Sequence, residues 1–197
     1  MISKFPDLCY NQHIAINYAN CLNLLGKPQE ALEVISTISD ARVKPATYYV
    51  NLSNIYISSL EFQKCYETAR EGLNKYPHDK DLLGNQTIAL TELGRFDEAI
   101  RSANERLKYD HDIPAICEAA HIQYKQAESL KNTEFPKAVD LYKKALRLFK
   151  SALEINPAYA DALYNVALIL FKMKRYTDAM NLSLIHISEP TRRVVIS

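Results

Sequence analysis

The chain has 197 residues, which is enough for one ordinary domain or one short array of repeats. Hydrophobic residues make up 48% and charged residues 24%, as in a folded, soluble protein, and the net charge of +1 gives no general attraction to nucleic acid. No apolar run approaches the ~20 residues that cross a bilayer, and the N-terminal sequence MISKFPDLCYNQ lacks the apolar core of a secretory signal. We therefore expect neither a nucleic-acid partner nor a membrane partner.

The composition also favours a helical chain without a metal or cofactor. There are only four glycines, and glycine weakens helix interiors by roughly 1 kcal/mol. The four cysteines are far apart and form no CxxC pair, so the sequence predicts neither a zinc site nor a redox motif. Unpaired cysteines are typical of a reducing compartment, and we expect a cytoplasmic protein with no cofactor.

The clearest local pattern is the segment LGRFDEAI, residues 93–100. Its Gly94, Phe96, Ala99 and Ile100 resemble the turn between the first helix (helix A) and the second helix (helix B) of a tetratricopeptide repeat (TPR). The resemblance implies an all-α fold, a TPR α-solenoid of stacked antiparallel helix pairs that forms a right-handed superhelix with a concave face. One hairpin cannot bury its apolar surfaces alone, whereas stacked hairpins share a continuous core.

From this anchor, a 34-residue period extends along the chain. After a lead-in at residues 1–11, we expect three regular units, a longer fourth unit and a fifth unit that stops inside its helix B: residues 12–45, 46–79, 80–113, 114–159 and 160–181. The family pattern places small residues where the helices approach closely. At the eighth position of each unit the chain has Ala19, Ser53, Thr87, His121 and Ala167, and at the twentieth it has Ala31, Cys65, Ala99, Ala138 and Ala179. Pro28 departs from the pattern, which has an aromatic residue there.

The fourth unit is twelve residues longer than the period. Its helix B fits the family spacing in two registers two helical turns apart, which predicts one long helix over residues 135–156. The other additional residues, in the stretch 126–134, lengthen either helix A or the turn after it. The insertion either forms a lip for a partner or only changes the pitch of the superhelix.

The last segment, LSLIHISEPTRRVVIS at residues 182–197, breaks the helical period. It resembles the translated sequence of an adapter used in transposase-based sequencing libraries, so we expect an artefactual tail after Asn181 and exclude it from the fold. The incomplete fifth unit then predicts artefactual self-association through its uncovered helix.

The sixth position of each unit, on helix A, carries asparagine in four of five units. This resembles the asparagine ladder with which some TPR arrays hold the backbone of an extended peptide along their concave face. An asparagine amide offers both a donor and an acceptor, as each peptide unit does. The residues expected to bind peptide on this face are Asn17, Asn20, Asn51, Asn54, Asn85, Asn165, Ile16, Val50, Tyr164 and Leu168. Of these, Ile16, Val50, Tyr164 and Leu168 are expected to be exposed, together with Phe171.

The fifth position argues against one known TPR specificity. The carboxylate clamp of chaperone-binding proteins needs a lysine at this position in its first unit, where this chain has Ile16. Catalytic motifs are also missing: the chain has no HExxH, P-loop or GxGxxG sequence. Cys65 and Cys117 fall at packing positions, where thiols are inert.

The sequence thus predicts a protein-interaction scaffold, not an enzyme, that binds an extended peptide or a helix in the concave TPR groove. A second hypothesis is that these repeats are an accessory region of a larger, truncated enzyme, such as a protein kinase or a glycosyltransferase. Neither hypothesis names the partner.

Overall fold

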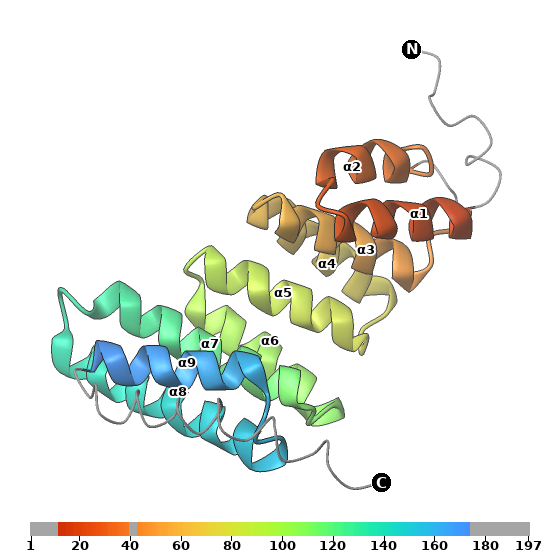
Figure 1. Ribbon diagram of the computed structural model, residues 1–197. Coiled ribbons are helices and arrows are strands. Elements are labelled where there is room, and N and C mark those ends of the chain that lie inside the picture. Colours follow the sequence, from red (N-terminus) through yellow and green to blue (C-terminus); the bar gives the residue numbers. More distant parts are fainter. Residues whose placement is uncertain (1–11, 40–42, 174–197) are drawn as a thin grey trace, which may run out of the picture. The chain divides into compact units, whose positions relative to one another are not determined.

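The computed structural model describes residues 12–39 and 43–173, and these residues form an all-helical structure (Figure 1). The helices of the described ranges are α1 (Gln12–Leu24), α2 (Pro28–Ser36), α3 (Ala46–Ser58), α4 (Phe62–Lys75), α5 (Lys80–Glu92), α6 (Phe96–Tyr109), α7 (Ile113–Leu130), α8 (Phe135–Ile155) and α9 (Ala160–Lys172). Consecutive helices pair as antiparallel hairpins, α1 with α2 through α7 with α8, so the predicted all-α fold of helix pairs is confirmed. The lead-in at residues 1–11, helix B of the fifth unit and the tail at 182–197 lie outside the described residues.

Local sequence signals explain where several helices begin. The Asp79 side chain accepts hydrogen bonds from the backbone N–H groups of Asp81 and Leu82, at 3.1 and 3.0 Å, and so caps α5. Asp112 caps α7 in the same way, through the N–H of Ala115 at 2.8 Å. Pro28 occupies the first turn of α2, where the missing N–H of proline costs nothing. The departure of Pro28 from the family pattern is therefore compatible with an ordinary helix start.

The three turns between helix A and helix B in the hairpins α1–α2, α3–α4 and α5–α6 share one backbone conformation. Gly26 and Gly94 have a φ of 75°, and Leu60 takes the equivalent place in the second hairpin with a φ of 59°. Glycine adopts this left-handed conformation without a steric cost, whereas leucine does not. Because the same turn forms in all three hairpins, the geometry of the hairpin overrides the local preference of Leu60.

An ion pair follows the turn at the start of every described helix B. The pairs are Lys27 with Glu30, Lys64 with Glu61, Arg95 with Glu98, and Lys137 with Glu134. Each spans three residues on the protein surface, so each contributes little to stability. The pairs mark the first turn of helix B. Because Glu134 and Lys137 form the equivalent pair in α8, this helix begins in the same register as the other B helices.

Met1–Tyr109 forms the first of two compact units, here called the N-terminal unit. Its helices meet at small residues: Ala19, Ala31, Cys65 and Ala99 are fully buried. Gly72 on α4 marks the closest approach, since a β-carbon there would lie 2.8 Å from Cβ of Tyr49 on α3 and 2.7 Å from Cδ1 of Leu82 on α5. Helices α3 and α5 therefore both pack against a position of α4 that admits no side chain.

We predict that Gly72→Ala destabilises the protein by about 1–2 kcal/mol, because overpacking against the rigid Tyr49 Cβ outweighs the better helix propensity of alanine. Urea denaturation followed by circular dichroism measures the change. Asn74→Ala, at an exposed position on the same helix, is the control and leaves stability unchanged or slightly higher. Equal stability of Gly72→Ala and the wild type would contradict this packing.

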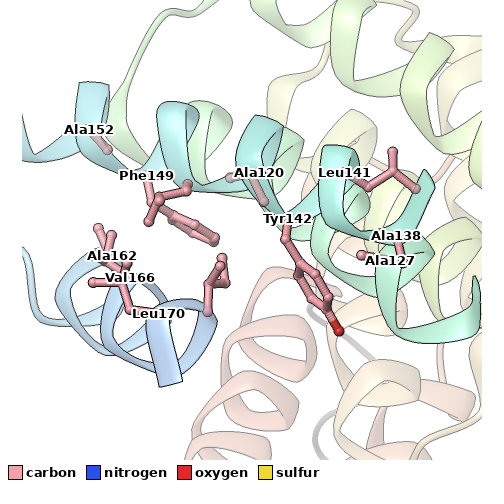
Figure 2. Close-up of a cluster of buried hydrophobic side chains, with 13 residues drawn as sticks. Ala120, Ala127, Ala138, Leu141, Tyr142, Phe149, Ala152, Ala162, Val166 and Leu170 are labelled. Carbon is pink, nitrogen blue, oxygen red and sulfur yellow. The ribbon is translucent and has the colours of Figure 1, made fainter. Parts of the chain in front are cut away.

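Asp110–Ser197 is the second compact unit, the C-terminal unit, described as far as residue 173. The predicted long helix B is confirmed as α8, Phe135–Ile155. Of the two alternatives for the stretch 126–134, helix A is the part that grows, because α7 continues to Leu130. Figure 2 shows how α8 directs Phe149 toward Val166 and Leu170 of α9, which buries the apolar stripes of both helices.

One half-buried carboxylate connects the three helices of the C-terminal unit. Glu128 on α7 accepts hydrogen bonds from the Tyr142 hydroxyl on α8 and from Nζ of Lys172 on α9, the latter at 3.0 Å. Burial raises the pKa of Glu128, but the hydrogen bonds from Tyr142, Lys172 and Lys131 outweigh it and leave the pKa below its ordinary value. Glu128 is therefore ionised and serves as a structural anion.

Candidate peptide-binding face

The A helices of the N-terminal unit form a surface with almost no formal charge. Helices α1, α3 and α5 are neighbours, and we call their outer surface the helix-A face. Neither α1 nor α3 contains any Asp, Glu, Lys or Arg, and α5 carries charge only near its ends, at Lys80, Asp81 and Glu92. The paired helix α4 is quite different and carries Lys64, Glu67, Arg70, Glu71 and Lys75. Charge is thus concentrated on the B helices.

The sixth-position asparagines of this face contact the preceding repeat. Nδ2 of Asn51 lies 3.4 Å from the carbonyl oxygen of Ile16, and Nδ2 of Asn85 lies 3.4 Å from that of Val50. The two contacts are equivalent, one repeat apart. At 3.4 Å both are longer than the usual 2.7–3.2 Å, so each is a weak bond.

Asn85 makes two stronger bonds as well. Its Nδ2 donates to Oγ of Ser53 and to Oδ1 of Asn54, each at 2.8 Å. The Ser53 hydroxyl in turn donates to the backbone carbonyl of Tyr49 at 2.7 Å. Because Asn85 is only 7% exposed, its side chain acts mainly between α5 and α3 and offers little surface to a ligand.

The other predicted residues of the N-terminal unit divide by burial. Asn17 is exposed, and Asn20, Asn51 and Asn54 are half-buried on the helix-A face. Val50 is half-buried and packs partly against the core. The expectation that Ile16 is exposed is wrong: it is 1% exposed, because it shares the buried stripe of α1 with Ala15, Ala19 and Leu22.

The predicted residues of the C-terminal unit lie on α9. Tyr164 and Phe171 are 67% and 56% exposed, as expected, whereas Leu168 is half-buried. Asn165 donates its Nδ2 to the carbonyl oxygen of Asp161 on its own helix, at 2.7 Å. Because this donor is used within α9, Asn165 makes no contact equivalent to those of Asn51 and Asn85 among the described residues.

A comparison with protein families gives a match to the tetratricopeptide repeat over residues 140–182. These residues carry a TPR motif, within a chain that has the stacked-hairpin fold of TPR structures. A search of curated protein sequences finds no match.

Solved structures similar to this TPR chain share its fold at low sequence identity. Pseudomonas aeruginosa PilF is 15% identical with a TM-score of 0.65, covering 89% of this chain and 75% of PilF. YrrB, described as a TPR protein with an unusual peptide-binding site, is 18% identical with a TM-score of 0.53, covering 90% of this chain and 86% of YrrB. A human IFIT1 dimer with m7Gppp-AAAA is 13% identical with a TM-score of 0.75, covering 90% of this chain but 42% of IFIT1. At these identities the likeness establishes the TPR fold, an architecture whose repeats create extended binding surfaces.

Two cysteines of these helices, Cys65 and Cys117, are neutral thiols. Cys65 is fully buried, its Sγ lies 3.6 Å from the carbonyl oxygen of Asn85, and burial raises its pKa to about 12. Burial, followed by the charges of Asp161, Glu118 and Asp112, raises the pKa of Cys117 to about 11. A thiol with such a pKa is not a nucleophile at neutral pH. In the described residues there is also no group of His, Cys, Asp and Glu suited to a metal ion.

None of the helices in the ranges 12–39 and 43–173 is long and apolar enough to cross a bilayer.

Ser53 is the residue of this site that sequence reasoning missed. Its position in the TPR pattern predicts only a small packing residue, and it is indeed fully buried. Its hydroxyl also accepts the Asn85 hydrogen bond. The sequence does contain a signal for this hydrogen bond: a serine at the eighth position of one unit is followed by an asparagine at the sixth position of the next unit. Packing alone does not need the hydroxyl, because alanine would also fit at the eighth position.

We predict that iodoacetamide at pH 8 labels Cys21 rapidly and leaves Cys65 unmodified in the native protein. Cys21 is exposed, whereas Cys65 is buried with a raised pKa. Peptide mass spectrometry after timed labelling measures both rates. Labelling in denaturant is the control, in which the two thiols react alike. Comparable native rates would show that Cys65 is accessible.

Proposed function

We propose that this TPR chain is a non-catalytic protein-interaction scaffold whose helix-A face binds an uncharged, extended peptide segment of a partner protein. The observation that carries the proposal is the contrast between charged B helices and the neutral, asparagine-rich surface of α1 and α3. Amide side chains pair with a peptide backbone without the desolvation penalty of a buried charge.

The half-buried asparagines suit this role best. Asn51 and Asn54 are one turn apart on α3, and residues so spaced have β-carbons about 5–6 Å apart on one helix surface. Asn17 and Asn20 repeat this arrangement on α1. In the C-terminal unit, considered by itself, the exposed Tyr164 and the half-buried Leu168 of α9 offer apolar contacts to a partner.

The similarity to YrrB, whose description includes a peptide-binding site, supports a peptide as the ligand class. The raised pKa values of Cys65 and Cys117 support the absence of thiol chemistry. Cys21, Cys65 and Cys117 are all unpaired, which favours a reducing compartment, and we place the protein in the cytoplasm.

The test begins with selection of dodecapeptides on the full chain from a phage-displayed library. The best peptide is synthesised with blocked ends, and its Kd is measured by fluorescence anisotropy. We expect Asn51→Ala with Asn54→Ala to weaken binding by roughly 10- to 100-fold, because each lost hydrogen bond is worth about 0.5–1.5 kcal/mol. Because the face is uncharged, the Kd changes little between low and high salt.

The matched control makes the same chemical change on the B helices. Asn74 on α4 and Asn104 on α6 are both exposed, and their double replacement by alanine leaves the Kd unchanged. The proposal fails if no peptide is selected, if both double variants bind equally well, or if binding depends steeply on salt.

A further inference from the structure

We propose that Asn85 is a positioning residue for peptide binding: it orients the amide of Asn54 so that the Nδ2 donor of Asn54 faces the ligand. This inference rests on the proposed function, in which the helix-A face binds an extended peptide. The sequence predicts that Asn85 contacts the peptide directly. In this inference Asn85 instead acts through its neighbour Asn54.

The orientation follows from a chain of hydrogen bonds that begins at a backbone carbonyl. The carbonyl oxygen of Tyr49 can only accept, so the Ser53 hydroxyl must donate to it, at 2.7 Å. The hydrogen of Ser53 is then used, and Ser53 Oγ accepts from its buried neighbour Asn85 at 2.8 Å. This requires the NH2 end of the Asn85 amide to face α3, which fixes how Asn85 is turned.

The same NH2 group also lies within hydrogen-bonding distance of the Asn54 amide and can only donate. Asn54 must therefore accept through its Oδ1, which lies 2.8 Å from Nδ2 of Asn85. The Nδ2 of Asn54 is left on the opposite side of the amide, and it makes no hydrogen bond with the described residues. Since Asn54 is half-buried, this donor lies at the edge of the solvent. Its natural partner is an acceptor, which on an extended peptide is a backbone carbonyl oxygen.

Asn51 supplies the complementary group one turn earlier on α3. Its Nδ2 points to the carbonyl oxygen of Ile16, which leaves its Oδ1 as an acceptor for a peptide N–H. In an extended strand the N–H and C=O of one residue lie on the same side of the chain. The pair therefore matches one residue of the ligand, with its N–H at Asn51 and its C=O at Asn54.

The experiment is a double-mutant cycle with the full chain and the synthetic dodecapeptide selected as described above. We expect Asn54→Ala to weaken binding about tenfold and Asn85→Ala about fivefold. The double variant should be about tenfold weaker than wild type, not about fiftyfold, because Asn85 has no effect once the Asn54 amide is gone. A purely structural role for Asn85 would not produce this dependence on Asn54.

Asn85→Asp provides a second variant with the same shape. A carboxylate cannot donate, so the Asn54 amide turns to donate to it and presents Oδ1 to the peptide. Binding should then fall as far as in Asn54→Ala, with no further loss when the two changes are combined. Thr87→Val is the control, since it removes another buried hydrogen bond of α5, from the Thr87 hydroxyl to the Leu83 carbonyl oxygen, that lies within α5 and does not involve Asn54.

The outcomes separate this inference from the proposed function. A peptide that requires Asn51 and Asn54 but binds the Asn85 variants within twofold of wild type would overturn the positioning role alone. Additive losses in the cycle, or an equal loss in Thr87→Val, would overturn it as well. Binding independent of Asn54 alone overturns the positioning role, whereas absence of any selected peptide, or full binding by the variant that lacks both Asn51 and Asn54, overturns both.

Discussion

The structure depends on the close approach of helices at positions that hold small residues. Ala31, Cys65, Ala99 and Ala138 occupy equivalent sites at the start of successive B helices, and all are fully buried. A larger side chain at such a site would separate helix A from helix B, and each repeat would lose the shared core that no single hairpin can form. Gly72 takes this constraint to its limit, because even a methyl group would contact Tyr49 and Leu82 at less than 3 Å.

Close packing also explains the polar chemistry of the helix-A face. With small residues between the helices, α3 and α5 lie near enough for Asn85 to reach both Ser53 and Asn54. A buried amide must be satisfied, and here the partners come from the preceding repeat. The same bonds that satisfy Asn85 thereby determine which end of the Asn54 amide faces outward. Packing, hydrogen bonding and the presentation of a ligand contact are thus linked in one short stretch of α3.

Most of the fold follows from the sequence, because it depends on local turns and on repeated small residues. LGRFDEAI identifies a repeat, and the long α8 follows from an apolar stripe that continues through two registers. The candidate site is less predictable. A repeat position predicts on which side of a helix a residue lies. It does not predict which hydrogen-bond donors and acceptors the neighbouring helix places beside that residue. Ile16 was expected on the surface and is buried, because the stripe of α1 is wide enough to include it. The hydrogen-bond direction of Asn85 depends on Ser53, which lies 32 residues away and which packing rules treat only as small.

The internal use of amides limits what the asparagines give to a ligand. Four asparagines with free amides would contribute about 2–6 kcal/mol to the free energy of peptide binding. However, Nδ2 of Asn85 and Nδ2 of Asn165 already donate hydrogen bonds within the protein. The two groups left on α3, Oδ1 of Asn51 and Nδ2 of Asn54, supply about 1–3 kcal/mol together. Micromolar binding needs about 8 kcal/mol, so a peptide held by these two groups alone must gain at least about 5 kcal/mol from other contacts, equivalent to roughly 200 Å² of buried apolar surface before the entropic cost of association. On this face Val50, Ile57 and Ile88 are half-buried apolar side chains able to take part. A partner that offers only backbone would therefore bind weakly, and the peptides that bind well carry apolar side chains between their backbone contacts.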